Sequence, residues 1–231
     1  LSKRNGEVSI AWYREQGYLP EAICNYLALL GWSPGDDREN ISMKELTELF
    51  TVEKVHSSPA RFDMKKLEAI NGDKIRALPL DEFATWTIPF LKKADVIAGS
   101  EDEVALVMKA LPLIQERIVK LDEAPALLKF LFVKNFAVDP EAAPKISDAA
   151  AKDILKRSLK DLESLDSWSH ESIEAALRAS LIEELGLKPR IAFTALRIAT
   201  TGSTISPPLF ESMELLGKQA CLERITAALA L

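Results

Sequence analysis

The sequence has few of the residues that form metal sites and disulfides. Its 231 residues include two cysteines, Cys24 and Cys221, and two histidines, His56 and His170. Each cysteine lies in its own apolar run, and no Cys or His is spaced from another as zinc ligands are. We therefore expect no metal site, two buried free thiols and a reducing compartment, the cytoplasm.

Long hydrophobic runs are also missing. No apolar run approaches the roughly 18–20 residues that cross a bilayer, and no segment has the pattern of a secretory or transit peptide. The sequence contains no glycine-rich phosphate loop and no common nucleophile or zinc-protease motif. We therefore expect neither a membrane partner nor a self-contained active site.

The chain lacks an initiator methionine and begins Leu-Ser-Lys-Arg-Asn-Gly. We expect it to be a piece of a longer protein that starts within a loop. Ser2, Lys3 and Arg4, followed by a glycine, can present backbone N–H groups and a cation to phosphate. A disordered chain end is the alternative interpretation.

Positive charge is in the minority, because 29 Lys and Arg face 35 Asp and Glu, for a net charge of −6. An acidic chain is unusual for a nucleic-acid binder, unless its basic residues are clustered. From residue 187 to the end, five Lys and Arg face three Glu, for a net charge of +2. This local reversal weakens the objection to nucleic-acid binding.

Apolar residues at three- and four-residue spacing predict helices along most of the chain. Capping boxes are expected at Ser42–Glu45 and Ser100–Glu103. The predicted helices cover about residues 19–30, 42–50, 63–70, 100–114, 124–132, 148–162, 171–185, 190–199, 206–216 and 218–229. The fold class is therefore mainly α.

Other patterns predict where helices give way. Val8–Tyr13 is rich in β-branched and aromatic residues and predicts a minor strand. Asn71-Gly72 should end one helix, and Pro112 should kink or break another. The Pro- and Ala-rich residues 139–144 are typical of a linker. Ser206 should cap a helix that has Pro207 at its first position.

Two clusters further along the chain could contact RNA. Arg117 should lie on the helix after Pro112, where its guanidinium could face a base edge. The alternative is a surface ion pair worth well under about 1 kcal/mol. In the 197–210 segment, Arg197 and a Leu209-Phe210 pair flank a hydroxyl-rich loop with two prolines. A ring beside an arginine suits an unpaired base, whereas core residues at a helix–helix corner would show the same pattern.

Several motifs follow one another in a characteristic order. They are Leu-Ser-Lys-Arg at the start, Gly17-Tyr18-Leu19-Pro20-Glu21-Ala22, Asn25-Tyr26-Leu27-Ala28-Leu29-Leu30-Gly31-Trp32, Phe62-Asp63-Met64-Lys65-Lys66-Leu67, Gln115-Glu116-Arg117, Thr201-Gly202-Ser203 and Ser206-Pro207-Pro208-Leu209-Phe210-Glu211-Ser212. Over essentially the whole chain they resemble the bacterial glutamyl-tRNA synthetase family. The first of them resembles the end of the Lys-Met-Ser-Lys-Ser loop of class I synthetases.

The resemblance implies a stem-contact domain with minor β structure over residues 1–76, followed by helical anticodon-binding subdomains over 77–138 and 139–231. It implies a parent that uses ATP with Mg²⁺ to make glutamyl-adenylate and then esterifies its tRNA. The catalytic fold would be missing here, so we expect this portion to bind tRNA as a monomer, to hold no cofactor and to be inactive alone. A helical protein-interaction scaffold is the alternative function.

The resemblance also assigns roles to residues. Lys3, with Ser2 and Arg4 in the same loop, would hold ATP phosphates in the parent. Arg117 would read the third anticodon base. The remaining tRNA-contacting positions would be Lys65, Lys66, Arg197, Leu209 and Phe210.

Two positions depart from the family pattern. Ala69 stands where many members have an aromatic residue two positions before Asn-Gly, which puts a stacking contact in doubt. Ser206-Pro207-Pro208 replaces a Thr-Pro-Gly of some relatives, so we expect a stiffer loop.

Overall fold

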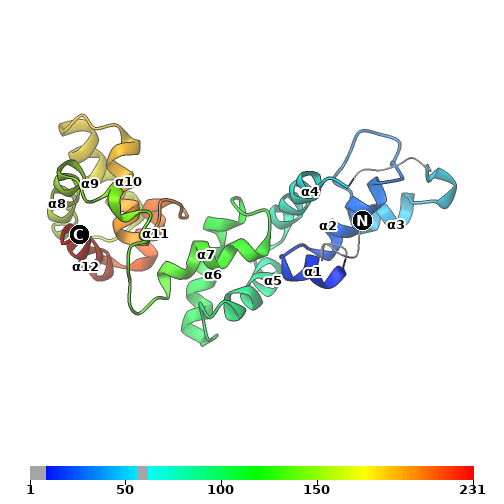
Figure 1. The fold of residues 1–231 in the computed structure, drawn as a ribbon, viewed down its shortest axis with the longest axis horizontal. Helices are drawn as coiled ribbons and strands as arrows, with labels where there is room; N and C mark the ends of the chain where they lie inside the picture. The colour runs from blue at the N-terminus through cyan, green and yellow to red at the C-terminus, as the bar shows by residue number, and fades with distance from the viewer. Residues whose placement is uncertain (1–8, 57–61) are drawn as a thin grey trace. The chain divides into compact units, whose positions relative to one another are not determined.

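In the computed structural model, residues 9–56 and 62–231 are described, and every regular element in these two ranges is helical. Figure 1 shows the helices in chain order, from α1 near the N-terminus to α12 at the C-terminus. The mainly-α prediction is confirmed. No helix in the described ranges has the length and apolar character to cross a membrane.

The strand predicted over Val8–Tyr13 is wrong. Val8 is outside the described residues, and α1 (Ile10–Glu15) begins two residues later. The Ser9 hydroxyl accepts a hydrogen bond from the backbone N–H of Trp12 at 3.1 Å. This cap pairs an N–H that a helix start would otherwise leave open, and the local gain outweighs the weak β preference of the segment.

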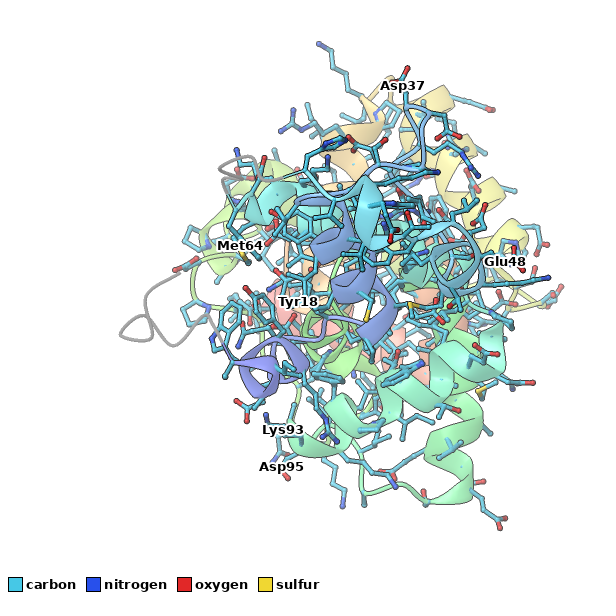
Figure 2. All side chains as sticks on the ribbon, turned by 90° about the vertical axis from the view of Figure 1, so that its right-hand side faces the viewer. Tyr18, Asp37, Glu48, Met64, Lys93 and Asp95 are labelled. Carbon is cyan, nitrogen blue, oxygen red and sulfur yellow. The ribbon has the colours of Figure 1, made fainter. Side chains whose placement is uncertain are left out.

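The chain divides into two compact units, of which the first comprises residues 1–95 and 114–125. In its centre α2 packs against α4. In Figure 2 the Tyr18 side chain lies among other side chains, whereas Asp37 lies at the outer edge. The helical elements that fall wholly in this unit are α1, α2 (Pro20–Leu29), α3 (Met43–Leu49), η2 (Val52–Lys54), α4 (Met64–Ala77), α5 (Leu80–Lys93) and η3 (Leu121–Glu123). The capping box of Ser42 and Glu45 at the start of α3 is confirmed.

Asn71-Gly72 does not end a helix, because α4 continues to Ala77. The buried Asn71 side chain accepts from the backbone N–H of Leu19 at 2.8 Å and donates to the carbonyl of Val119 at 2.6 Å. A Cβ on Gly72 would lie 3.1 Å from Val119 Cγ1. The Asn-Gly pair therefore serves a close tertiary contact in mid-helix and does not form a C-cap.

The second unit comprises residues 96–113 and 126–231. Here α12 packs on α8 and α10, and α11 packs on α9, as the group on the left of Figure 1 shows. Their buried faces form one core that includes Leu155, Leu177 and Ile225. The elements are η4 (Lys129–Leu131), η5 (Ala143–Lys145), α8 (Ala149–Glu163), α9 (His170–Leu177), the π-helical η6 (Arg178–Glu184), α10 (Pro189–Thr201), α11 (Leu209–Leu216) and α12 (Lys218–Leu229).

Two of the three boundaries between the units fall inside helices, in α6 (Glu101–Gln115) and in α7 (Ala124–Leu128). The predicted cap of α6 is confirmed, since Glu103 accepts from the N–H of Ser100 at 2.9 Å and donates its own N–H to the Ser100 hydroxyl at 3.3 Å. The helix continues past Pro112 to Gln115, so the proline does not break it.

The predicted linker at residues 139–144 is instead a packed turn. Ala142 is buried in the core of the second unit. Asp139 donates its backbone N–H to the carbonyl of Gly202 at 2.8 Å and accepts from the N–H of Ala142 at 2.8 Å. Proline and alanine therefore mark a tight turn here.

Two further predictions fail around Gly202. Helix α10 extends through Thr201, beyond its predicted end, and Gly202 follows it with a left-handed φ of 84°. Ser206 does not cap α11, which starts at Leu209 without a side-chain cap. The Ser206 hydroxyl instead donates to the carbonyl of Pro207 at 2.8 Å and accepts from Arg197.

The cysteine prediction is half right. Cys221 is buried in the core of the second unit, whereas Cys24 on α2 is exposed. Both are free thiols.

Candidate nucleic-acid interface

The predicted contact residues that the structure describes fall into two groups. Lys65, Lys66 and Arg117 belong to the first unit, and the 197–210 segment belongs to the second. The phosphate-binding loop of Ser2, Lys3 and Arg4 lies outside the described residues.

Lys65 and Lys66 occupy the first turn of α4. Asp63 caps the helix by accepting from their backbone N–H groups at 2.9 and 3.3 Å. The Lys66 ammonium lies 2.8 Å from a Glu39 carboxylate oxygen. Lys65 is exposed and has no ion-pair partner within residues 9–56 and 62–231. Lys65 is therefore the member of the pair that can approach a phosphate without breaking an existing contact.

Arg117 lies in the turn after α6 and not on the helix. The turn is held firmly, because its neighbours Ile114 and Ile118 are fully buried. The Gln115 amide also donates to the carbonyls of Ile75 and Leu78, at 2.9 Å each. These neighbours fix the backbone of the turn, from which the Arg117 side chain extends into solvent.

The ion-pair alternative for Arg117 finds no support. Across the residues that the structure describes, its side chain makes no hydrogen bond or ion pair. Lys120, one turn further on, faces Asp122 at 3.5 Å. An exposed arginine fork of this kind keeps its five donors available to a planar acceptor.

Arg197 organises the loop between α10 and α11. Its guanidinium donates to the Ser206 hydroxyl and, at 2.9 Å, to the carbonyl of Pro207. Arg197 is half-buried. One arginine therefore joins the two ends of the hydroxyl-rich loop.

Leu209 and Phe210 start α11 but have different surroundings. Leu209 is 4% exposed and belongs to the core of the second unit. Phe210 is partly buried, and its ring meets the ring of Phe193 edge to face, with centroids 5.1 Å apart. The core interpretation of the Leu-Phe pair therefore describes Leu209, while Phe210 retains some accessible surface.

Sequence reasoning missed a buried arginine behind this loop. Arg224 on α12 donates to the carbonyl of Thr200 at 2.7 Å and of Phe130 at 2.9 Å. Its guanidinium carbon lies 4.0 Å from the centre of the Phe136 ring. Its burial could have been predicted from the sequence, because helical spacing places Arg224 on the same face of α12 as Cys221 and Ala228.

His170 also has partners that its sequence context did not reveal. Its Nδ1 lies 2.8 Å from Glu214 and its Nε2 3.2 Å from Glu171. The hydrogen bond to Glu214 raises the pKa of His170 above its usual 6.5. The described residues contain no group of three or more His, Cys, Asp or Glu that could hold a metal.

A hollow of about 570 Å³ opens in the first unit beside α2 and α3. Its lining is mostly apolar and includes Leu27, Trp32 and Phe50. Convergent polar groups, which a catalytic or small-molecule site needs for orientation, are missing from the described part of this lining.

Two protein families match the chain. Residues 82–229 match the family described as "Anticodon binding domain". Residues 1–69 match the family described as "tRNA synthetases class I (E and Q), catalytic domain".

Individual relatives agree with these matches. The glutamate–tRNA ligase of Saccharopolyspora erythraea is 44% identical over 99% of this chain and 46% of its own length. That of Rhodococcus jostii is 46% identical over 100% of this chain and 47% of its own length. A crystal structure of a glutamate tRNA ligase from Elizabethkingia meningosepticum, in complex with its amino acid, superimposes with a TM-score of 0.80 at 27% identity.

The chain covers 48% of that crystallised ligase, so it spans about half the length of the relatives it matches. The family match to residues 82–229 includes most of the chain, and the helical fold agrees with the solved relative. The chain therefore belongs to the anticodon-binding domain family, and its first 69 residues are similar to the class I synthetase catalytic domain.

Proposed function

We propose that this chain is the tRNA-binding portion of a glutamate–tRNA ligase and that Arg117 reads the third anticodon base. The observation that supports this role most strongly is an exposed guanidinium, unpaired among the described residues, on a turn that Ile114, Ile118 and Gln115 hold in place. An arginine fork on such a turn can bind two acceptors on one base edge.

The other contacts follow from the same assignment. Lys65 and Lys66 lie near the anticodon stem and loop. Arg197 and Phe210 lie at the anticodon bases, with the partly exposed Phe210 ring as the stacking surface, and the buried Leu209 supports the start of α11 beside them. The proposed division has a stem-contact domain over residues 1–76 and anticodon-binding subdomains over 77–138 and 139–231.

In the proposed parent, ATP with Mg²⁺ activates glutamate, and Lys3 in the loop with Ser2 and Arg4 holds the ATP phosphates. The activated glutamate then passes to the terminal adenosine of its tRNA. We place the parent in the cytoplasm, as a monomer without a membrane partner. The 231 residues alone bind tRNA and hold no cofactor.

Arg117→Ala tests the central contact. For tRNA with the matched third anticodon base, we expect a loss of roughly 1–3 kcal/mol, because two hydrogen bonds to a base edge disappear. For tRNA with another base at that position, the loss should be smaller. Filter binding of both tRNAs at low salt measures the difference.

Arg14→Ala is the matched control, since Arg14 is also an exposed arginine of the first unit. It should leave the preference between the two tRNAs unchanged. An equal loss for every tRNA with Arg117→Ala would make Arg117 a phosphate contact. Absence of any binding by the unsubstituted chain at low salt would favour the protein-interaction scaffold instead.

A further inference from the structure

Arg224 is a cation in the interior of the second unit, with 9% of its surface exposed. No carboxylate pairs with it among the described residues, and burial lowers its pKa. Removing a charge from water costs several kcal/mol unless other groups compensate. Contacts within the protein must therefore compensate for the hydration that the Arg224 guanidinium loses.

The compensation comes from three segments of the chain. One guanidinium nitrogen donates to Thr200 in the last turn of α10, and another donates to Phe130 in η4. The Phe136 ring covers the guanidinium face at 4.0 Å. A planar guanidinium can donate in its plane and stack on its face at the same time, which an ammonium cannot do.

Phe136 in turn supports the turn at Gly202. A Cβ on Gly202 would lie 3.3 Å from Phe136 Cε2 and 3.0 Å from the Ala137 carbonyl oxygen. The carbonyl of Gly202 accepts from the N–H of Asp139 at 2.8 Å. Arg224, the Phe136 ring and the Gly202 backbone therefore lie in successive contact. We call these three residues the clamp.

One helical turn of α10 separates the Thr200 carbonyl that Arg224 of the clamp binds from Arg197, a proposed tRNA contact. Thr201, next to the carbonyl that Arg224 binds, donates its hydroxyl to the carbonyl of Arg197 at 2.8 Å. Arg197 then donates to Ser206 and Pro207 on the far side of the Gly202 turn. Ser206 and Pro207 are thus bound to Arg197, and Arg197 is bound to Thr201, the neighbour of the Thr200 that Arg224 binds.

We propose that Arg224 is a positioning residue, which fixes the Gly202 turn and thereby sets Arg197 and Ser206 for contact with the anticodon. The proposal rests on the proposed function, and it gives Arg224 no contact with RNA. Its effect on tRNA must therefore pass through Arg197 and the loop.

Two substitutions in the 231-residue chain test the proposal. Arg224→Lys keeps the charge but loses the fork and the stacked plane, and Phe136→Leu keeps apolar bulk but loses the ring. Each should weaken binding of tRNA with the matched anticodon about tenfold, the effect expected when one or two hydrogen bonds between the loop and the tRNA are lost. Binding to a mismatched tRNA should change less, so that the ratio of the two affinities falls.

Ile225→Val separates positioning from simple destabilisation. Ile225 is a fully buried neighbour on α12, and its shortening lowers stability without removing any hydrogen bond. At a temperature where circular dichroism shows each variant folded, it should keep the affinity ratio of the unsubstituted chain. An equal fall in that ratio for Ile225→Val would overturn the proposal.

A double-mutant cycle with Arg197→Ala gives the decisive measurement. If Arg224 acts through Arg197, Arg224→Lys should change affinity less than twofold in the Arg197→Ala chain. A full tenfold loss in both backgrounds overturns the inference and leaves the proposed function intact. A chain that binds no tRNA before any substitution overturns both.

Discussion

At the scale of single residues, three buried polar side chains bind backbone groups of distant segments. Asn71 pairs with Leu19 and Val119, and the Lys74 ammonium donates to the carbonyl of Ile41 at 2.7 Å. Arg224 does the same in the second unit. Burying such groups is tolerated because each finds a partner. Asn71 and Lys74 consequently fix segments without regular structure, whereas Arg224 joins α10 to η4.

The two cysteines should differ in reactivity. Burial raises the pKa of Cys221 to about 12, whereas Cys24 is exposed. Because the thiolate is the reactive form, iodoacetamide at pH 8 should alkylate Cys24 in the native chain and reach Cys221 only after unfolding. Mass spectrometry of tryptic peptides measures both sites.

Cys24→Ser is the control for this experiment. Native Cys24→Ser chain should take up little label, and urea should restore one equivalent. Rapid labelling of native Cys24→Ser would show that Cys221 is accessible, contrary to its position in the core.

At the scale of elements, sequence pattern predicted most helices and failed at particular ends. Ser42 and Ser100 form the capping boxes that their spacing predicts, because all partners lie within four residues. Asn71 and Ser206 carry similar local signals, but their side chains bind groups that are remote in sequence or belong to Arg197. Local chemistry was therefore sufficient only where no tertiary partner competed for the side chain.

The candidate contact residues show the same division. Sequence and resemblance indicated Arg117 and Arg197, since an arginine beside a recognisable motif can be identified from the sequence alone. They gave no indication that Gln115 anchors the turn of Arg117 or that Arg224 supports the loop of Arg197. These supports depend on carbonyl groups, which every residue carries and which no sequence pattern marks.

The pairing of α9 with α11 should depend on pH. Glu214 raises the pKa of His170, and Glu171 and Glu211 add to this effect. A raised folded-state pKa means that the pair stabilises the fold below pH 6.5, the unfolded-state value, and that this stability is lost as pH rises through the folded-state pKa. Glu214→Gln should therefore destabilise the chain at pH 6 and have less effect at about pH 9.

Urea unfolding followed by circular dichroism at the two pH values measures this difference. Glu174→Gln on α9 removes an ion pair with Arg178, the first residue of η6, and Glu174 has no histidine partner among the described residues. Its effect should be the same at both pH values. A loss for Glu214→Gln that is independent of pH would assign the contact to a neutral hydrogen bond.

At the scale of the whole molecule, the chain spans about half the length of the ligases that it matches. The 231 residues alone, supplied with tRNA, ATP, Mg²⁺ and glutamate, should therefore charge no tRNA. Acid precipitation of radiolabelled glutamate on tRNA measures charging, with the intact Rhodococcus jostii ligase as the positive control. Charged tRNA from the 231 residues would contradict the proposed division of labour.

The first unit has a consequence for synthesis of the chain. Its residues 1–95 are completed by 114–125, which follow most of α6. Leu121 donates its N–H to the carbonyl of Gly17 at 3.1 Å, and Val119 accepts from Asn71. A nascent chain cannot close these contacts until residues 114–125 have been made and have left the ribosome, because these residues supply the partners of Gly17 and Asn71. A chain that ended at residue 69 or 82, the boundaries of the two family matches, would lack residues 114–125, and its first unit would stay incomplete.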